Sequence, residues 1–191
     1  MATDQKLVRF YEHAQLYVKK ERSEELEEMR EASSLDYFQR LTQNEFMREY
    51  VWTFYASGFK NAILERKFLA LEKVFENFNL DRICRMSSTA AVLSVINHAK
   101  KADAVLEGAH LVFKMGFPNL KEQLLRLGPG ALVQLPYIGA IDKKHLARNI
   151  GLASLHKNDV WVKRLVNLSG SKDDDQMIGD LSQRSTKKLA L

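Results

Sequence analysis

Apolar residues recur along this chain at intervals of three and four positions, and this spacing limits the fold more than any other feature. One apolar stripe occupies residues 7–18 and another occupies residues 46–55. Such spacing places apolar side chains on one face of an α-helix, whereas the alternation typical of half-buried strands is rare here. The sequence therefore predicts an all-α fold. Further helices are predicted over residues 61–75, 89–100 and 102–115.

Composition excludes several classes of protein. Of the 191 residues, 46% are hydrophobic and 28% are charged, which suits a soluble domain with a substantial core. No apolar run approaches the ~18 residues that a membrane-spanning helix needs, and the polar N-terminus lacks a secretory pattern. We therefore expect a cytoplasmic chain with no membrane partner. The single cysteine, Cys84, rules out a four-cysteine iron–sulfur cluster, and the five histidines lack a metal-ligand spacing, so no metal site is expected.

The charge is unevenly distributed. The formal net charge is +5, and acidic residues outnumber basic ones only in the first 50 positions. The charged stretch 19–31 is interpreted as a solvated helical face. The basic balance of the remaining chain favours polyanionic partners, although many proteins that bind none share it.

The segment 128–151 carries the most specific pattern. All three prolines lie between positions 118 and 136, so we expect short helices separated by tight turns there. The segment is interpreted as a short helix, a hairpin over 135–139 and a second helix from about Ala140. Pro136 ends the first helix, and Gly139 allows another backbone to come close. The hairpin amides and the helix N-terminus could together hold a phosphate oxygen, or the segment could be a plain turn between packed helices. The residues predicted to contact DNA are Pro136, Tyr137, Ile138, Gly139, Lys143, Lys144 and Arg148.

A second motif follows the hairpin and its helix. Residues 159–164 read Asp-Val-Trp-Val-Lys-Arg. Together with Leu135-Pro136-Tyr137-Ile138-Gly139, this arrangement resembles the helix-hairpin-helix DNA glycosylase superfamily, the endonuclease III-like base-excision enzymes. Their signature is Leu-Pro-Gly-Val/Ile-Gly, a helix, a loop and Asp-x-His-Val-x-Arg. Segments 49–59 and 97–105 are also similar to parts of these enzymes, so the resemblance covers roughly residues 45–170.

The resemblance implies a fold of two helical lobes with a cleft between them. In this interpretation, one glycosylase-like unit spans residues 1–191. Its parts are an N-terminal extension (1–45), a helical lobe (46–134), the hairpin and second helix (135–151), and a helix with the active-site aspartate followed by a tail (152–191). The chain departs from the family pattern at Tyr137, which replaces a glycine. It departs again at Ile141, where members that also cleave the DNA strand carry a lysine.

The resemblance also implies a reaction. A glycosylase extrudes a nucleotide from the duplex and breaks its N-glycosidic bond through a cation-like sugar. Asp159 would stabilise that cation and activate water, although an N-cap is the simpler role for this residue. With Ile141 in place of the lysine, we expect a monofunctional enzyme. The alternative is a glycosylase and lyase that uses Lys143 or Lys144 as its amine nucleophile.

The predicted base pocket includes residues that could equally serve to fill the core. Its members are Trp52, Tyr55, Ser57, Phe59, Lys60 and Ile141, with Phe59 or Lys60 filling the gap left by the extruded base. Core packing is the alternative for the aromatic members, and His98 and His145 are interpreted as structural. We expect a nucleoid-associated monomer that acts on double-stranded DNA with a damaged or modified base, in repair or in defence against phage. Beyond a monovalent cation at the hairpin carbonyls of Tyr137 and Gly139, no cofactor is expected. The rivals to this interpretation are a non-catalytic DNA-binding module and a helical interaction protein.

Overall fold

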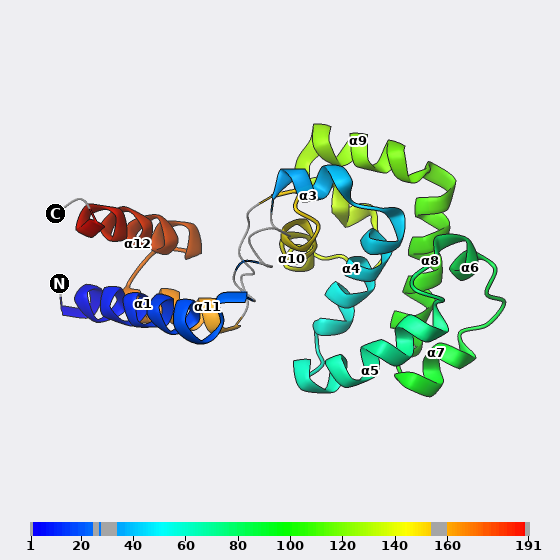
Figure 1. Ribbon diagram of the computed structural model, residues 1–191, viewed down its shortest axis with the longest axis horizontal. Helices are drawn as coiled ribbons and strands as arrows, with labels where there is room; N and C mark the ends of the chain where they lie inside the picture. The colour runs from blue at the N-terminus through cyan, green and yellow to red at the C-terminus, as the bar shows by residue number, and fades with distance from the viewer. Residues whose placement is uncertain (1, 25–26, 28–33, 154–159, 190–191) are drawn as a thin grey trace. The chain divides into compact units, whose positions relative to one another are not determined.

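The computed structural model describes residues 2–24, 27, 34–153 and 160–189 (Figure 1). Every regular element in these ranges is a helix, which confirms the predicted all-α class. The chain forms two compact units. One unit combines the two ends of the chain, Met1–Arg30 and Lys157–Leu191, and the other is the continuous stretch Glu31–His156. No helix in the described ranges has the length and apolar character needed to cross a membrane.

Within the described ranges of the terminal unit, three helices pack against one another. They are α1 (Ala2–Glu21), α11 (Val160–Ser169) and α12 (Asp174–Leu189). Gly170, with φ +70°, ends α11, and the side chain of Asp173 accepts the amide hydrogen of Gln176 at 2.8 Å to begin α12. The connection between α11 and α12 therefore spans only residues 170–173.

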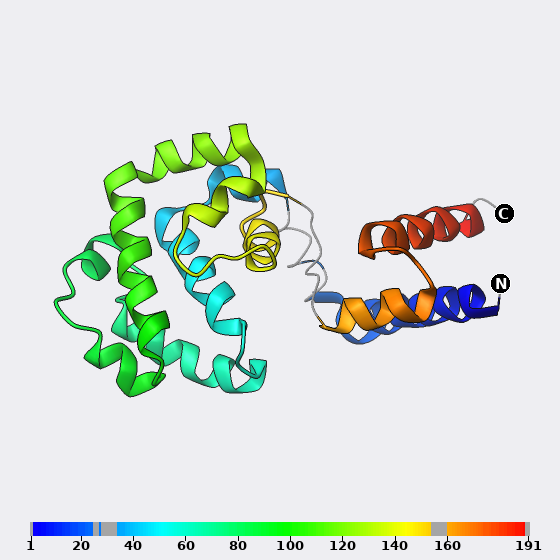
Figure 2. The same cartoon turned by 180° about the vertical axis from the view of Figure 1, so that it is seen from behind.

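The central unit is built around α4 (Gln43–Ala56), half of whose residues are buried. This helix packs against α5, α6, α8 and α10. Both views show α4 between α8 and α10 (Figures 1 and 2). It begins with a capping box, in which Thr42 and Glu45 exchange hydrogen bonds between side chain and backbone. The remaining elements of this unit are α3 (Leu35–Arg40), α5 (Asn61–Val74), α6 (Leu80–Cys84), α7 (Ala90–Val95), α8 (Ala99–Met115), α9 (Phe117–Leu127), the 3-10 helix η1 (Gly128–Gln134) and α10 (Asp142–Asn149).

Two predicted helix boundaries are wrong. The helix expected over 89–100 ends at Val95, and α8 begins at Ala99 rather than at residue 102. The break arises because Ile96 is extended and the imidazole of His98 accepts the amide hydrogen of Lys101 at 3.3 Å, which caps α8. Pro118 lies in the first turn of α9, where proline is tolerated, so this helix reaches eleven residues.

Three lysines hold the C-terminal ends of helices. The last carbonyl groups of a helix have no partner within it and carry partial negative charge, so an ammonium group satisfies both needs. The donor and acceptor pairs are Lys67 Nζ with Val95 O at 2.7 Å, Lys101 Nζ with Phe54 O at 2.6 Å and with Ser57 O, and Lys121 Nζ with Gln39 O at 2.7 Å and Leu41 O at 3.3 Å. These three positive charges therefore stabilise helix ends within the fold.

Candidate functional site

A tight turn lies where the sequence predicts the hairpin. The amide of Ile138 donates to the carbonyl of Leu135 at 3.2 Å, which closes a four-residue turn between η1 and α10. Pro136 occupies its second position, and Tyr137 occupies its third with φ +65°. Proline followed by a residue of positive φ is the pattern of a type II turn.

Tyr137 adopts the left-handed conformation that glycine adopts without strain. For an L-residue this conformation costs roughly 1–2 kcal/mol. Tyrosine in place of glycine therefore leaves the turn intact and introduces local strain. Tyr137 is 43% exposed, and the centroid of its ring lies 6.1 Å from that of Phe54.

Gly139 differs from Tyr137, because its φ lies outside the left-handed region. A Cβ atom built on Gly139 would meet only the Oδ2 atom of Asp142, at 3.9 Å, which is an ordinary contact. The fold thus has no steric need for glycine at this position. Within the described part of the chain, the amides of Gly139, Ala140 and Ile141 donate no hydrogen bond. The backbone is open here to an external acceptor that comes close.

Tyr50 anchors the turn to the core. Its hydroxyl lies 2.7 Å from the carbonyl oxygen of Pro136 and 3.1 Å from that of Ala104. Burial, with a smaller effect of Glu107, raises the pKa of Tyr50 well above its usual value, so the hydroxyl remains a donor. Gly108 on α8 makes room for this ring, because a Cβ there would lie 2.5 Å from the Cε1 and hydroxyl oxygen atoms of Tyr50.

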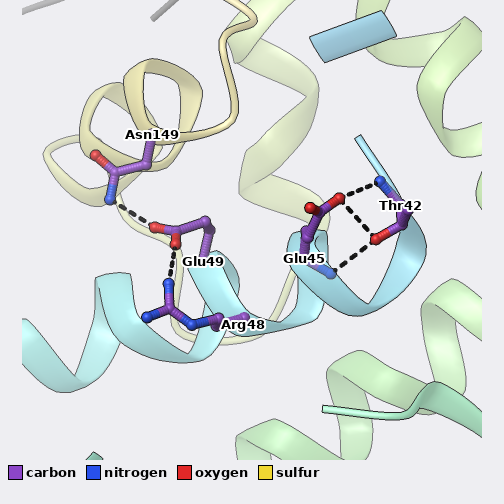
Figure 3. A network of polar contacts seen from close by, with 5 residues as sticks. All are labelled: Thr42, Glu45, Arg48, Glu49 and Asn149. Atoms are coloured by element: carbon purple, nitrogen blue, oxygen red, sulfur yellow. Dashed lines mark hydrogen bonds and ion pairs between the residues drawn. The ribbon is translucent and has the colours of Figure 1, made fainter. Parts of the chain in front are cut away.

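Helix α10 is held against α4 by a buried face and a polar contact. His145, Leu146 and Ala147 form the buried face. Figure 3 shows the carboxylate of Glu49 between Asn149, whose amide nitrogen donates at 3.0 Å, and Arg48, whose guanidinium lies 2.8 Å away. Burial raises the pKa of Glu49, and the charge of Arg48 and the two hydrogen bonds oppose this shift.

Helix α10, which follows the turn, carries three basic residues. Lys143, Lys144 and Arg148 are each partly exposed, and the amide of Lys143 donates to the carbonyl of Gly139 at 3.0 Å. Burial lowers the pKa of the Arg148 guanidinium. Asp142 adds a carboxylate in the first turn of α10, and its charge raises the pKa of Lys101 against the larger, lowering effect of burial.

The predicted pocket residues divide between core and surface. Tyr55 is fully buried, and Trp52 packs edge-on against Phe68 with ring centroids 4.9 Å apart, so core packing describes both. Ser57 and Lys60 are exposed in the segment that joins α4 to α5. Phe59 in that segment is partly buried, and Ile141 is 42% exposed at the start of α10.

A row of aromatic rings connects the turn to the segment after α4. Ring centroids are 6.1 Å apart for Tyr137 and Phe54, 5.2 Å for Phe54 and Tyr55, and 6.2 Å for Tyr55 and Phe59. Lys101 completes this region, because its Nζ lies 4.9 Å from the Phe59 centroid and 5.6 Å from that of Tyr55. The structure therefore brings the hairpin and the predicted pocket segment together. Sequence analysis missed Lys101, which is only 5% exposed.

The remaining residues that the sequence singled out belong to other elements or lie outside the described residues. Asp159, the expected active-site carboxylate, lies outside the described residues. Lys163 and Arg164 are exposed on α11. His98 caps α8 and His145 is buried, as expected for structural histidines. The described residues contain no group of three or more His, Cys, Asp or Glu side chains placed to hold a metal ion.

Comparison with known proteins adds no relative. No family model, no curated protein and no solved structure matches this chain. The hairpin and its surroundings therefore carry the evidence for a function.

Proposed function

We propose that this protein is a DNA glycosylase of the helix-hairpin-helix type, with two helical lobes and a cleft between them. It excises a damaged or modified base from double-stranded DNA and leaves an abasic site. The observation that carries the proposal is the turn 135–139, whose backbone is open at Gly139.

The turn binds the phosphate backbone of the DNA. Amides that make no internal hydrogen bond, next to the N-terminus of α10, suit a phosphate oxygen because both the N–H groups and the helix dipole favour negative charge. A glycine without a steric role in the fold suits the close approach of a DNA backbone. Lys143, Lys144 and Arg148 add positive charge on the same helix. These contacts read no sequence, so they position the enzyme along any duplex.

Asp159 supplies the chemistry. As the carbon–nitrogen bond to the base breaks, the carboxylate stabilises the positive charge on the sugar and accepts a proton from the water that attacks C1′. The electron pair of the broken bond leaves with the base. Ile141 carries no amine, so water rather than a lysine is the nucleophile.

The direct test measures released bases. The full chain is incubated with duplexes carrying oxidised, alkylated or mismatched bases and with naturally modified phage DNA, and free bases are identified by mass spectrometry. The proposal predicts release by the wild type and not by Asp159→Asn. The matched control is Asp173→Asn, which changes an aspartate that caps α12 and should keep full activity.

Two other outcomes would change the proposal. Borohydride trapping of a covalent adduct that disappears in Lys143→Met or Lys144→Met would indicate the glycosylase and lyase alternative. Absence of release from every substrate, with salt-sensitive binding retained, would contradict catalysis and favour a non-catalytic DNA-binding module. That second candidate has support of its own, because the hairpin lies entirely within the central unit 31–156.

A further inference from the structure

Tyr137 supplies an aromatic ring that the turn itself does not need. The turn requires a positive φ at this position, and glycine would adopt it without strain, whereas Tyr137 adopts φ +65° and is 43% exposed. The anchoring bond from Tyr50 reaches the carbonyl of Pro136 and would survive loss of the Tyr137 side chain. The geometry of the turn therefore does not explain the aromatic ring.

The surroundings of the ring suggest a use for it. Its inner side packs on Phe54, which is buried, at a tilt of 47°. Its outer side is open, two residues before the exposed backbone of Gly139. The ring is thus the exposed end of the aromatic row that continues through Tyr55 to Phe59.

We propose that the ring of Tyr137 is a stacking surface for an unpaired nucleobase of the DNA strand held at the hairpin. The inference rests on the proposed function, because the hairpin must hold DNA for the ring to meet a base. Every nucleobase offers a flat face that stacks on an aromatic side chain, so this contact requires no particular sequence. Support from Phe54 fixes the direction of the ring before DNA arrives. The hydroxyl group has no part in stacking, so phenylalanine can replace tyrosine.

The test compares two DNA ligands. Fluorescence anisotropy of the full chain gives the affinity for a paired duplex and for the same duplex with one unpaired adenine. The wild type and Tyr137→Phe should prefer the unpaired base. Tyr137→Gly and Tyr137→Asn, which both tolerate the left-handed conformation, should lose about fivefold or more of the affinity for it and keep that for the paired duplex. The control is Phe113→Ala, which removes the aromatic ring of another exposed residue, 57%, in the last turn of α8 and should change neither affinity.

Three results would overturn the inference. If Tyr137→Gly and Tyr137→Asn bind both duplexes as the wild type does, the ring contacts no DNA. If both variants lose affinity equally for the two duplexes, the ring contacts the DNA backbone and not a base. If the wild type binds neither duplex, the proposed function itself fails. Circular dichroism melting of each variant establishes that the fold is intact.

Discussion

Replacement of Gly108 by alanine should destabilise the central unit, although alanine is the better helix former. A Cβ atom at this position would lie 2.5 Å from two atoms of the Tyr50 side chain and 2.7 Å from its Cζ atom. Carbon atoms do not approach so closely, so either α8 or the buried ring must move. Movement of the ring breaks the hydrogen bond from Tyr50 to Pro136 that anchors the hairpin.

The magnitude follows from three contributions. Overpacking a filled core costs about 1–3 kcal/mol. A buried hydroxyl and carbonyl that lose each other cost about 1–3 kcal/mol more. The higher helix propensity of alanine returns about 1 kcal/mol. The net loss is roughly 1–5 kcal/mol, which lowers the melting temperature by roughly 2–20 °C in a chain of this size.

Differential scanning calorimetry of the full chain measures the change. The matched control is Gly179→Ala on α12, where no described atom lies within 4 Å of the added Cβ. This control should raise the stability of its unit by up to about 1 kcal/mol. A Gly108→Ala protein as stable as the wild type would refute the role assigned to this glycine.

Three further predictions concern the contacts that support the site. Tyr50→Phe should lower the free energy of unfolding by about 1–2 kcal/mol in urea and speed hydrogen exchange of the hairpin amides; unchanged exchange would mean that Tyr50 does not hold the turn. Lys101→Met should cost about 1–3 kcal/mol in the same measurement, because the α4 carbonyls lose their donor; equal stability would contradict that capping role. Hydrogen bonds from the backbone and side chain of Thr42 lower the pKa of Glu45 below its ordinary 4.5. The contribution of Glu45 to folding stability is therefore complete above pH 4.5 and is lost as the pH falls through the lowered pKa. The stability difference between the wild type and Glu45→Gln should therefore shrink below pH 4.5, and a difference that persists into strong acid would exclude an ionised cap.

Features fixed by local chemistry could be predicted from the sequence. Pro136 restricts its own φ and stops η1, and the apolar spacing of α4 and α5 gives those helices within a few residues. The turn at the hairpin follows from the same local constraints. The conformation of Tyr137 did not follow, because a bulky residue with positive φ contradicts its own preference.

Features that depend on distant partners could not be predicted. Lys101 is buried because it meets the carbonyl of Phe54, 47 positions away, and no local pattern distinguishes it from a solvated lysine. The ring of Tyr50 similarly determines the need for Gly108. The break before α8 was missed for a different reason, because histidine is not among the residues that usually cap helices.

The most direct test of the proposal that the hairpin binds DNA is the affinity of Gly139→Ala for a paired duplex, measured by fluorescence anisotropy. The added Cβ fits the fold, so the free energy of unfolding should be unchanged or slightly higher. If the amides around Gly139 hold a phosphate, affinity should fall about tenfold, as expected when a hydrogen bond to a charged group is lost. The control, Gly130→Ala in η1, also adds a Cβ to open space and should bind as the wild type does. A Gly139→Ala protein that binds DNA with wild-type affinity would contradict the role of the hairpin.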